Sequence, residues 1–177
     1  MIGWMAAVVV AWAEPVALRG PRAEPTAVIG LHDFSVGAPI GPVELAASVR
    51  TDRGAFDIAV GRRWQLRGDD EGWRVDAGVS AGLVVPLVRP GVGLTATPWL
   101  SAGLLREHGF FQALVAAPIA VAAPGGARLP GLLEVAGGGT VGRVTFGPRF
   151  AFGAVVAPDT DVSVVTEGAL VVSLRTP

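Results

Sequence analysis

Two short motifs in the chain match patterns that carry chemistry in other proteins. Residues 78–82, Gly-Val-Ser-Ala-Gly, fit the G-x-S-x-G pattern, which exposes a serine nucleophile at a sharp turn between a strand and a helix. Residues 137–142, Gly-Gly-Gly-Thr-Val-Gly, fit the G-x-G-x-x-G pattern, which binds phosphate only where a helix begins behind it. Pro86 prevents a helix after the first motif, and a strand-like segment follows the second. We therefore predict neither a nucleophile at Ser80 nor a nucleotide site.

Residues that could bind a metal ion are few. His32 and His108 are the only histidines, and the chain has no cysteine. Asp69, Asp70 and Glu71 form a carboxylate cluster in a predicted turn, which could bind Ca²⁺ weakly or could simply be an exposed loop. A zinc site needs more converging ligands than these. We predict no catalytic residue, no metal site and no cofactor, and we expect that the protein is not an enzyme.

The composition restricts the remaining classes of protein. Of the 177 residues, 51% are hydrophobic and 16% are charged, with a formal net charge of −1. Soluble domains carry about 25% charged residues, so this composition suits an ordinary water-facing surface poorly. The 14 basic and 15 acidic residues form no block of like charge, and nothing indicates nucleic-acid binding. The 25 Gly and 14 Pro oppose long helices and favour an all-β fold.

Strict alternation of large apolar residues with small or polar ones runs through four segments. These segments are 54–66, 72–87, 92–105 and 144–156. A period of two is typical of strands whose two faces meet different surroundings. Weaker alternation is present in five further segments: 25–35, 42–51, 109–122, 131–141 and 160–175. The turn signals between these nine segments are short, so they predict an antiparallel up-and-down meander.

Charged residues within these segments fall on the face that also carries Gly, Ala, Ser and Thr. The apolar face carries only one charge, Arg62. A face of small residues fits the cramped interior of a narrow barrel. We therefore predict a lumen charge network of five acids and three bases: Glu44, Asp57, Arg63, Arg74, Asp76, Glu134, Arg149 and Glu167. We expect paired side chains to fill the lumen rather than line an open channel, although both arrangements stay possible.

An apolar exterior around a polar interior is typical of transmembrane β-barrels, in which closure satisfies every backbone hydrogen-bonding group. Trp64 and Trp73 flank one predicted turn, where we expect them as interface aromatics at one membrane–water boundary. Arg62 should then lie near that rim. Pro86, Pro98 and Pro118 should each lie at a bulge or a rim, because proline donates no ladder hydrogen bond.

The N-terminal residues have a pattern typical of a secretory signal peptide. Residues 1–13 carry no charge and end in Ala-Trp-Ala, an A-x-A cleavage pattern. The predicted organisation is a signal peptide over residues 1–13, an N-terminal linker over 14–24 and a transmembrane β-barrel domain over 25–176.

On these features the chain resembles the small outer-membrane β-barrel proteins of Gram-negative bacteria. The resemblance is architectural, resting on the signal-like start, the alternating segments and the tight turns, and no motif of a particular family carries it. It implies an all-β antiparallel up-and-down closed barrel of about eight to ten strands with its apolar face outward. It also implies a monomer in the bacterial outer membrane, in contact with the lipid bilayer and the outer-membrane assembly machinery, without nucleic acid. The expected role is structural, adhesive or that of a minor, porin-like channel, without catalysis.

Two questions stay open at this point. Nine segments is an odd number, whereas bacterial single-chain barrels use even strand counts, so one segment is a plug or loop or one strand has been missed. The alternative function is a soluble secreted or periplasmic β-barrel that binds an apolar ligand, with its large residues turned inward.

Overall fold

In a computed structural model of the chain, the described residues are 24–51, 54–69, 71–87, 92–122, 131–156 and 162–175. The predicted signal peptide over residues 1–13 lies outside these ranges, and so does all of the predicted linker except Glu24. Within these ranges, no helix is long and apolar enough to cross a membrane.

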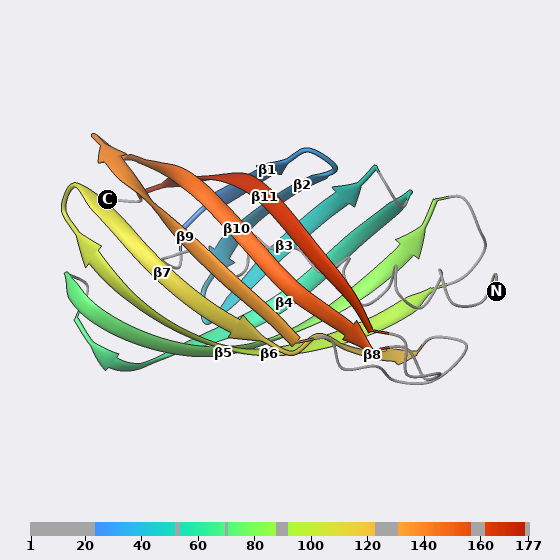
Figure 1. Cartoon of the computed structure of the whole chain (residues 1–177). Coiled ribbons are helices and arrows are strands. Elements are labelled where there is room, and N and C mark those ends of the chain that lie inside the picture. The colour runs from blue at the N-terminus through green and yellow to red at the C-terminus, as the bar shows by residue number, and fades with distance from the viewer. Residues whose placement is uncertain are drawn as a thin grey trace.

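The fold is built entirely from strands that wind around a common axis (Figure 1). In chain order they are β1 (Thr26–Gly30), β2 (Asp33–Ile40), β3 (Val43–Arg50), β4 (Ala55–Gly68), β5 (Gly72–Pro86), β6 (Gly93–Arg106), β7 (Gly109–Ala116), β8 (Ile119–Ala122), β9 (Gly131–Val141), β10 (Val144–Val156) and β11 (Val162–Leu174).

The strands form one closed antiparallel barrel. Each strand from β1 to β6 pairs with the next, β7 pairs with β9, and β9, β10 and β11 follow in order. β11 then pairs with β1, from Thr26 opposite Ser173 to Gly30 opposite Ala169, and closes the sheet. β7 and β8 both pair with β6, one after the other, so together they occupy one position in a ten-stranded barrel. The prediction of an all-β antiparallel closed barrel is confirmed.

The segment 25–35 was predicted as one strand, and this prediction is wrong. β1 ends at Gly30 and β2 begins at Asp33, so a two-residue turn divides the segment. That turn contains no Gly or Pro, whereas Gly37 and the following proline, which resembled a turn, lie within β2. The true turn follows at Gly41, whose φ of 61° is a left-handed conformation that glycine adopts without strain. The missed strand restores an even number of strands.

Pro86, Pro98 and Pro118 all lie at places where the pairing between strands is already interrupted, either by a strand end or by the break between β7 and β8. Pro86 is the last residue of β5, and Pro118 lies in the break between β7 and β8. Pro98 pairs with Val79 of β5 on one side and faces the same break on the other. On that other side Ala96 pairs with β8, and the next residue to pair is Trp99, with β7. The prolines therefore disturb the wall at one strand end and at one interruption.

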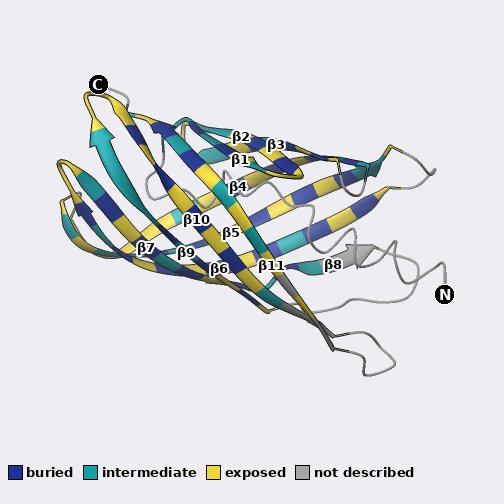
Figure 2. Ribbon diagram, turned by 45° about the horizontal axis from the view of Figure 1, so that its top comes forward, coloured by how far each residue is buried: buried dark blue, intermediate teal, exposed yellow. Residues whose placement is uncertain are grey.

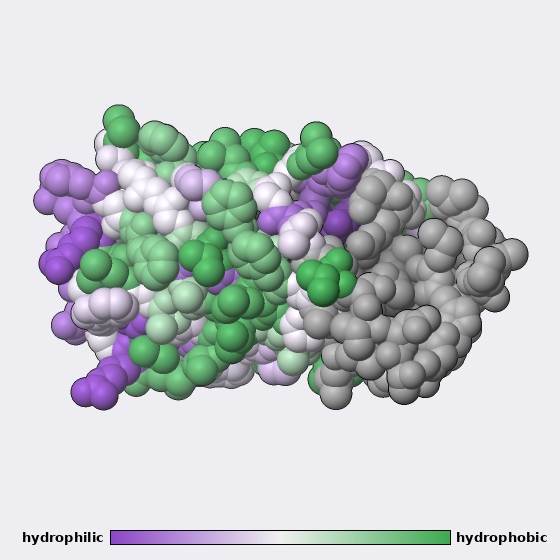
Figure 3. All heavy atoms as spheres, viewed as in Figure 1, coloured by the Kyte–Doolittle hydropathy of each residue, from purple (hydrophilic) through white to green (hydrophobic). Residues whose placement is uncertain are grey.

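The two faces of the barrel differ sharply, as the alternating colours along the strands in Figure 2 show. Val79 and Phe150 are 41% and 51% exposed, whereas their chain neighbours Ser80 and Arg149 are 2% and 3% exposed. Each of the ten strand positions carries at least one large hydrophobic side chain on the outer face. Figure 3 shows a hydrophobic middle of the molecule, with hydrophilic residues gathered at the end where β11 stops.

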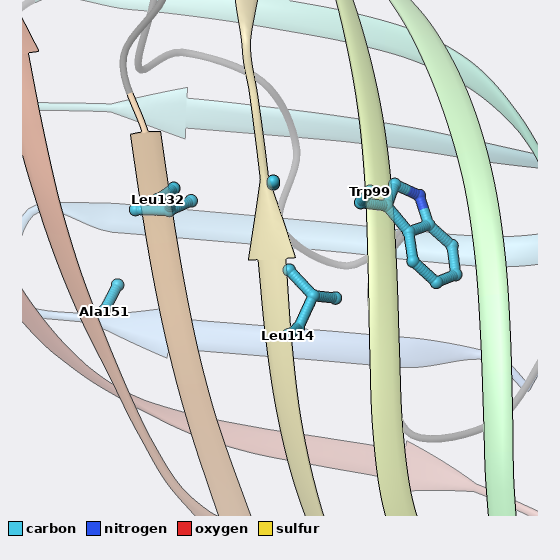
Figure 4. Close-up of a cluster of buried hydrophobic side chains, with 5 residues drawn as sticks. Trp99, Leu114, Leu132 and Ala151 are labelled. Atoms are coloured by element: carbon cyan, nitrogen blue, oxygen red, sulfur yellow. The ribbon is translucent and has the colours of Figure 1, made fainter.

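The interior holds a smaller apolar cluster as well as polar groups. Trp99, Leu114, Ala116, Leu132 and Ala151 are buried together, on β6, β7, β9 and β10 (Figure 4). The indole of Trp99 lies against Gly78 on the neighbouring strand, so that a Cβ at Gly78 would overlap its ring. A side chain at this position has no room in the lumen.

Gly78→Val should therefore lower the free energy of unfolding by about 1–3 kcal/mol, because the added methyl groups displace Trp99 from a filled interior. The measurement is the urea midpoint of the refolded barrel, followed by gel migration without boiling. Gly131→Val is the matched control, because nothing lies within 4 Å of a Cβ there. Equal midpoints for the two variants would contradict the close approach of Trp99.

Candidate functional site

The eight charged residues predicted for the lumen all occupy inward-facing, largely buried positions. Asp57, Asp76, Glu134 and Arg149 are between 1% and 4% exposed. The side chains of Glu44, Arg63, Arg74 and Glu167 are between 5% and 15% exposed. The period of two explains this placement, because each charged residue shares its strand face with Gly, Ala, Ser or Thr. The candidate site is therefore the interior itself, and its chemistry depends on how the charges are paired.

One ion cluster joins three neighbouring strands. Arg63 on β4 places its Nε 3.1 Å from Oε1 of Glu44 on β3 and its Nη1 4.0 Å from Oδ2 of Asp76 on β5. Arg74 lies two residues before Asp76 on the same face of β5 and donates from Nε to both carboxylate oxygens, at 2.7 and 2.8 Å. Two arginines and two carboxylates thus balance one another at this level of the lumen.

Trp99 completes this cluster, and sequence reasoning missed it. The Arg63 guanidinium carbon lies 5.2 Å from the centroid of the Trp99 ring, within the range of a cation–π interaction. Trp99 is 6% exposed and points inward from β6, although most large residues point outward. In segment 92–105 the odd-numbered residues form the small-residue face, and Trp99 is one of them. The alternation alone would therefore have placed Trp99 in the lumen, despite its large side chain.

A second ion pair joins β9 and β10. Arg149 donates from Nε to Oε2 of Glu134 at 3.0 Å, and its Nη2 lies 2.8 Å from Oε1. Two parallel contacts between a guanidinium and a carboxylate make the strongest form of this pair. Both side chains are 4% exposed, so the pair is shielded from solvent.

A third ion pair crosses the lumen. Nη2 of Arg50 on β3 donates to Oε1 of Glu167 on β11 at 3.1 Å, although β1 and β2 lie between these strands in the wall. Arg50 and its cross-strand partner Asp33 are each 5% exposed. Neither was among the predicted lumen residues, although Arg50 alternates onto the small-residue face of its segment. The described interior thus contains six acids and four arginines.

Little free space lies beside the Arg74–Asp76 pair. A cavity of about 10 Å³ lies next to Arg74 and Asp76 and is also lined by Ser101 and Gln112. A space of this size holds about one water molecule. At this level the lumen is filled by paired side chains.

The motifs that could carry catalysis lie within regular strands. Ser80 is in the middle of β5 and 2% exposed, with its hydroxyl 3.5 Å from the carbonyl oxygen of Thr97. The glycines of residues 137–142 form the end of β9 and the following turn, where Gly138 lies too close to the Phe146 carbonyl for a side chain. Neither motif is followed by the helix that its chemistry requires.

The candidate metal ligands do not converge. His32 lies in the turn after β1, and His108 lies in the turn after β6, at the opposite end of the barrel. Asp69 and Glu71 are exposed, and Asp70 lies outside the described residues. No group of three or more His, Cys, Asp or Glu within the described ranges could hold a metal ion.

Trp64 and Trp73 lie on the outer face of the β4–β5 hairpin, 42% and 69% exposed. The Arg62 guanidinium carbon lies 5.5 Å from the Trp64 ring centroid. Gly61 is the last residue of β4 that pairs with β3, so Arg62 lies beside the turn at Gly41, where this side of the wall ends. The hairpin continues beyond that rim.

The fold and interior define a class: a closed antiparallel ten-stranded β-barrel, consistent with the architecture of outer-membrane barrels. The chain matches no protein-family model, and no curated protein sequence matches it.

Arg149→Ala should lower the free energy of unfolding by about 3–5 kcal/mol, because it leaves the buried Glu134 carboxylate without its partner. Arg67→Ala, at an exposed position, should cost less than about 1 kcal/mol. Urea unfolding of the refolded barrels, followed by intrinsic tryptophan fluorescence, measures both. The shielded ion pair would be disproved if Arg149→Ala and Arg67→Ala unfolded at the same urea concentration.

Proposed function

We propose that this chain is a small integral outer-membrane β-barrel with a structural, adhesive or minor-channel role and no catalytic activity. The observation that carries the proposal is the orientation of the side chains. Large hydrophobic groups face outward around the whole barrel, and the buried charges face inward. Water is a poor solvent for such an exterior, whereas lipid chains are a good one.

The closed wall supports the same proposal. In a bilayer every backbone N–H and C=O must find a partner within the protein, which only helices and closed barrels achieve. The pairing of β1 with β11 leaves the sheet without free edges at the seam. The tryptophans of the β4–β5 hairpin lie on the outer face, where aromatic rings mark a membrane–water boundary.

The connections at the two ends differ in length. The end at which β11 stops has only short connections, at 41–42, 69–71, 107–108 and 142–143. The opposite end has one two-residue turn, at 31–32, and longer links over residues 51–54, 87–92, 123–130 and 157–161. Bacterial outer-membrane barrels combine short periplasmic turns with longer extracellular loops. We therefore infer that the end at which β11 stops faces the periplasm.

The paired interior favours a structural or adhesive role over conduction. Three sets of ion pairs occupy the lumen, and their side chains are shielded from solvent. A barrel of about eight strands has an interior just wide enough for side chains to fill, and this barrel is only two strands wider. Contact with the outer-membrane assembly machinery, and existence as a monomer, belong to the same proposal.

Membrane extraction tests the proposal against the soluble alternative. The protein expressed with its N-terminal segment should stay in the membrane fraction through alkaline carbonate, and should migrate differently on SDS gels with and without boiling. A mutant in which Phe150 and Phe152, both exposed on β10, are replaced by Asp should fail to enter the membrane. Release of the unaltered protein into carbonate buffer would instead support a soluble barrel that binds an apolar ligand.

Cysteine labelling tests the outward face directly, because the chain has no native cysteine. Phe150→Cys places a thiol on the outer face near the middle of β10, and Glu107→Cys places one in an exposed turn. In lipid vesicles, a water-soluble maleimide should modify Glu107→Cys completely and Phe150→Cys by less than about a tenth, because thiolate chemistry needs water. Both thiols should react after unfolding in urea. Complete modification of Phe150→Cys in vesicles would show that this face meets water.

A further inference from the structure

Four arginines surround the end of the barrel at which β11 stops. Arg67 lies near the end of β4, Arg106 ends β6, Arg143 lies in the turn between β9 and β10, and Arg175 follows β11. The first three are exposed and the fourth is half-buried. We call these residues the arginine collar.

Each member of the collar lies at the border of the hydrophobic outer face. Arg67 follows Leu66, which is 60% exposed, and Arg175 follows Leu174, which is 51% exposed. Arg143 lies between Val141 and Val144, which are 69% and 39% exposed. Arg106 ends the strand that carries the exposed Leu100. Strands that carry apolar outer surface therefore end at or next to an arginine at this end of the barrel.

The acids at this end lie farther from the apolar surface than the arginines do. Asp69 and Glu71 belong to the turn beyond Arg67, and Glu107 follows Arg106 in the next turn. Glu107 has His108 as its neighbour, with Nε2 3.9 Å from Oε2. Within the described ranges, no member of the collar forms an ion pair. At the ends of β4 and β6, an arginine thus lies between the hydrophobic surface and the described acids of the turn.

Two members of the collar are held side by side. The backbone N–H of Arg175 donates to the carbonyl oxygen of Arg143 at 2.8 Å, so the two strand ends cannot separate without breaking this bond. Guanidinium groups bind phosphate through two parallel hydrogen bonds, and paired arginines at one height can hold one phosphate between them.

We propose that the arginine collar binds the phosphate groups of anionic phospholipids in the leaflet at this end of the barrel. The inference rests on the proposed membrane function and names the lipid chemistry that this end selects. The order along β4 and β6 carries it: apolar surface, then guanidinium, then carboxylate, which matches the order of acyl chain, phosphate and water across one leaflet. The collar fixes the depth of the barrel in the bilayer as well as the lipids around it.

Native mass spectrometry tests the proposal on the full chain, refolded in detergent micelles that contain equal amounts of phosphatidylglycerol and phosphatidylcholine. The unaltered protein should carry phosphatidylglycerol in preference to phosphatidylcholine by at least about fivefold, the effect of roughly one arginine near an anionic surface. The preference should fall as NaCl is raised, because salt screens exposed charges.

Replacement of all four arginines by Gln should bring the ratio of the two lipids to about one. Replacement of the same four by Lys is the matched control and should retain the preference, because the charge remains. Arg106→Gln and Arg143→Gln alone should each reduce the ratio, which keeps the test valid if the fourfold Gln variant does not fold. Equal binding of the two lipids by the unaltered protein, or an unchanged ratio in the folded fourfold Gln variant, would overturn the proposal.

The same samples separate this inference from the proposed membrane function. Carbonate resistance and the shift on SDS gels report insertion of the barrel, whichever lipid it carries. A barrel that inserts but shows no preference for phosphatidylglycerol refutes the collar alone. A chain that carbonate releases refutes the membrane function and the collar with it.

Discussion

The pairing of β1 with β11 is the contact on which the rest of the structure depends. β1 is only five residues long, yet it turns an open sheet into a tube. A hydrogen bond between the hydroxyl groups of Thr26 and Ser173, 2.9 Å apart, reinforces the seam from inside. Once the sheet is closed, every side chain on a strand has only two directions available, and the period of two assigns each residue to one of them. The division between an apolar exterior and a charged interior follows directly.

The narrow lumen then dictates the pairing of its charges. An isolated ion in this interior would lose its hydration without compensation, at a cost of several kcal/mol. The chain meets this cost by placing arginines next to carboxylates at three sites. It also places small residues on the neighbouring strand where a large side chain must fit inside the lumen. Gly78 is the clearest example, because the ring of Trp99 occupies the space that any other residue would need. The narrow lumen thus explains both the ion pairs and the small residues that face it.

Much of the fold could be predicted from the sequence because alternation is a local signal. Residues 72–87 alternate clearly, and the structure makes residues 72–86 one strand that faces two environments. The division of 25–35 could not be found in this way, because the turn between β1 and β2 lacks the usual turn residues. The alternation along each strand also predicts that the eight charged residues point into the lumen. Which charge meets which depends on the stagger and number of the strands, and these are properties of the closed barrel as a whole. The contact of Arg50 with Glu167, across two intervening strands, is therefore invisible to any local pattern.

That contact also has a consequence for the order of events in folding. Its partners are 117 positions apart in the chain, and they meet only after the first and last strands have joined. An interaction that forms after the folding transition state contributes little to the folding rate. Its stabilising free energy instead slows unfolding. The third ion pair thus holds together strands on either side of the five-residue strand β1, and it makes the seam slow to open once the barrel has formed.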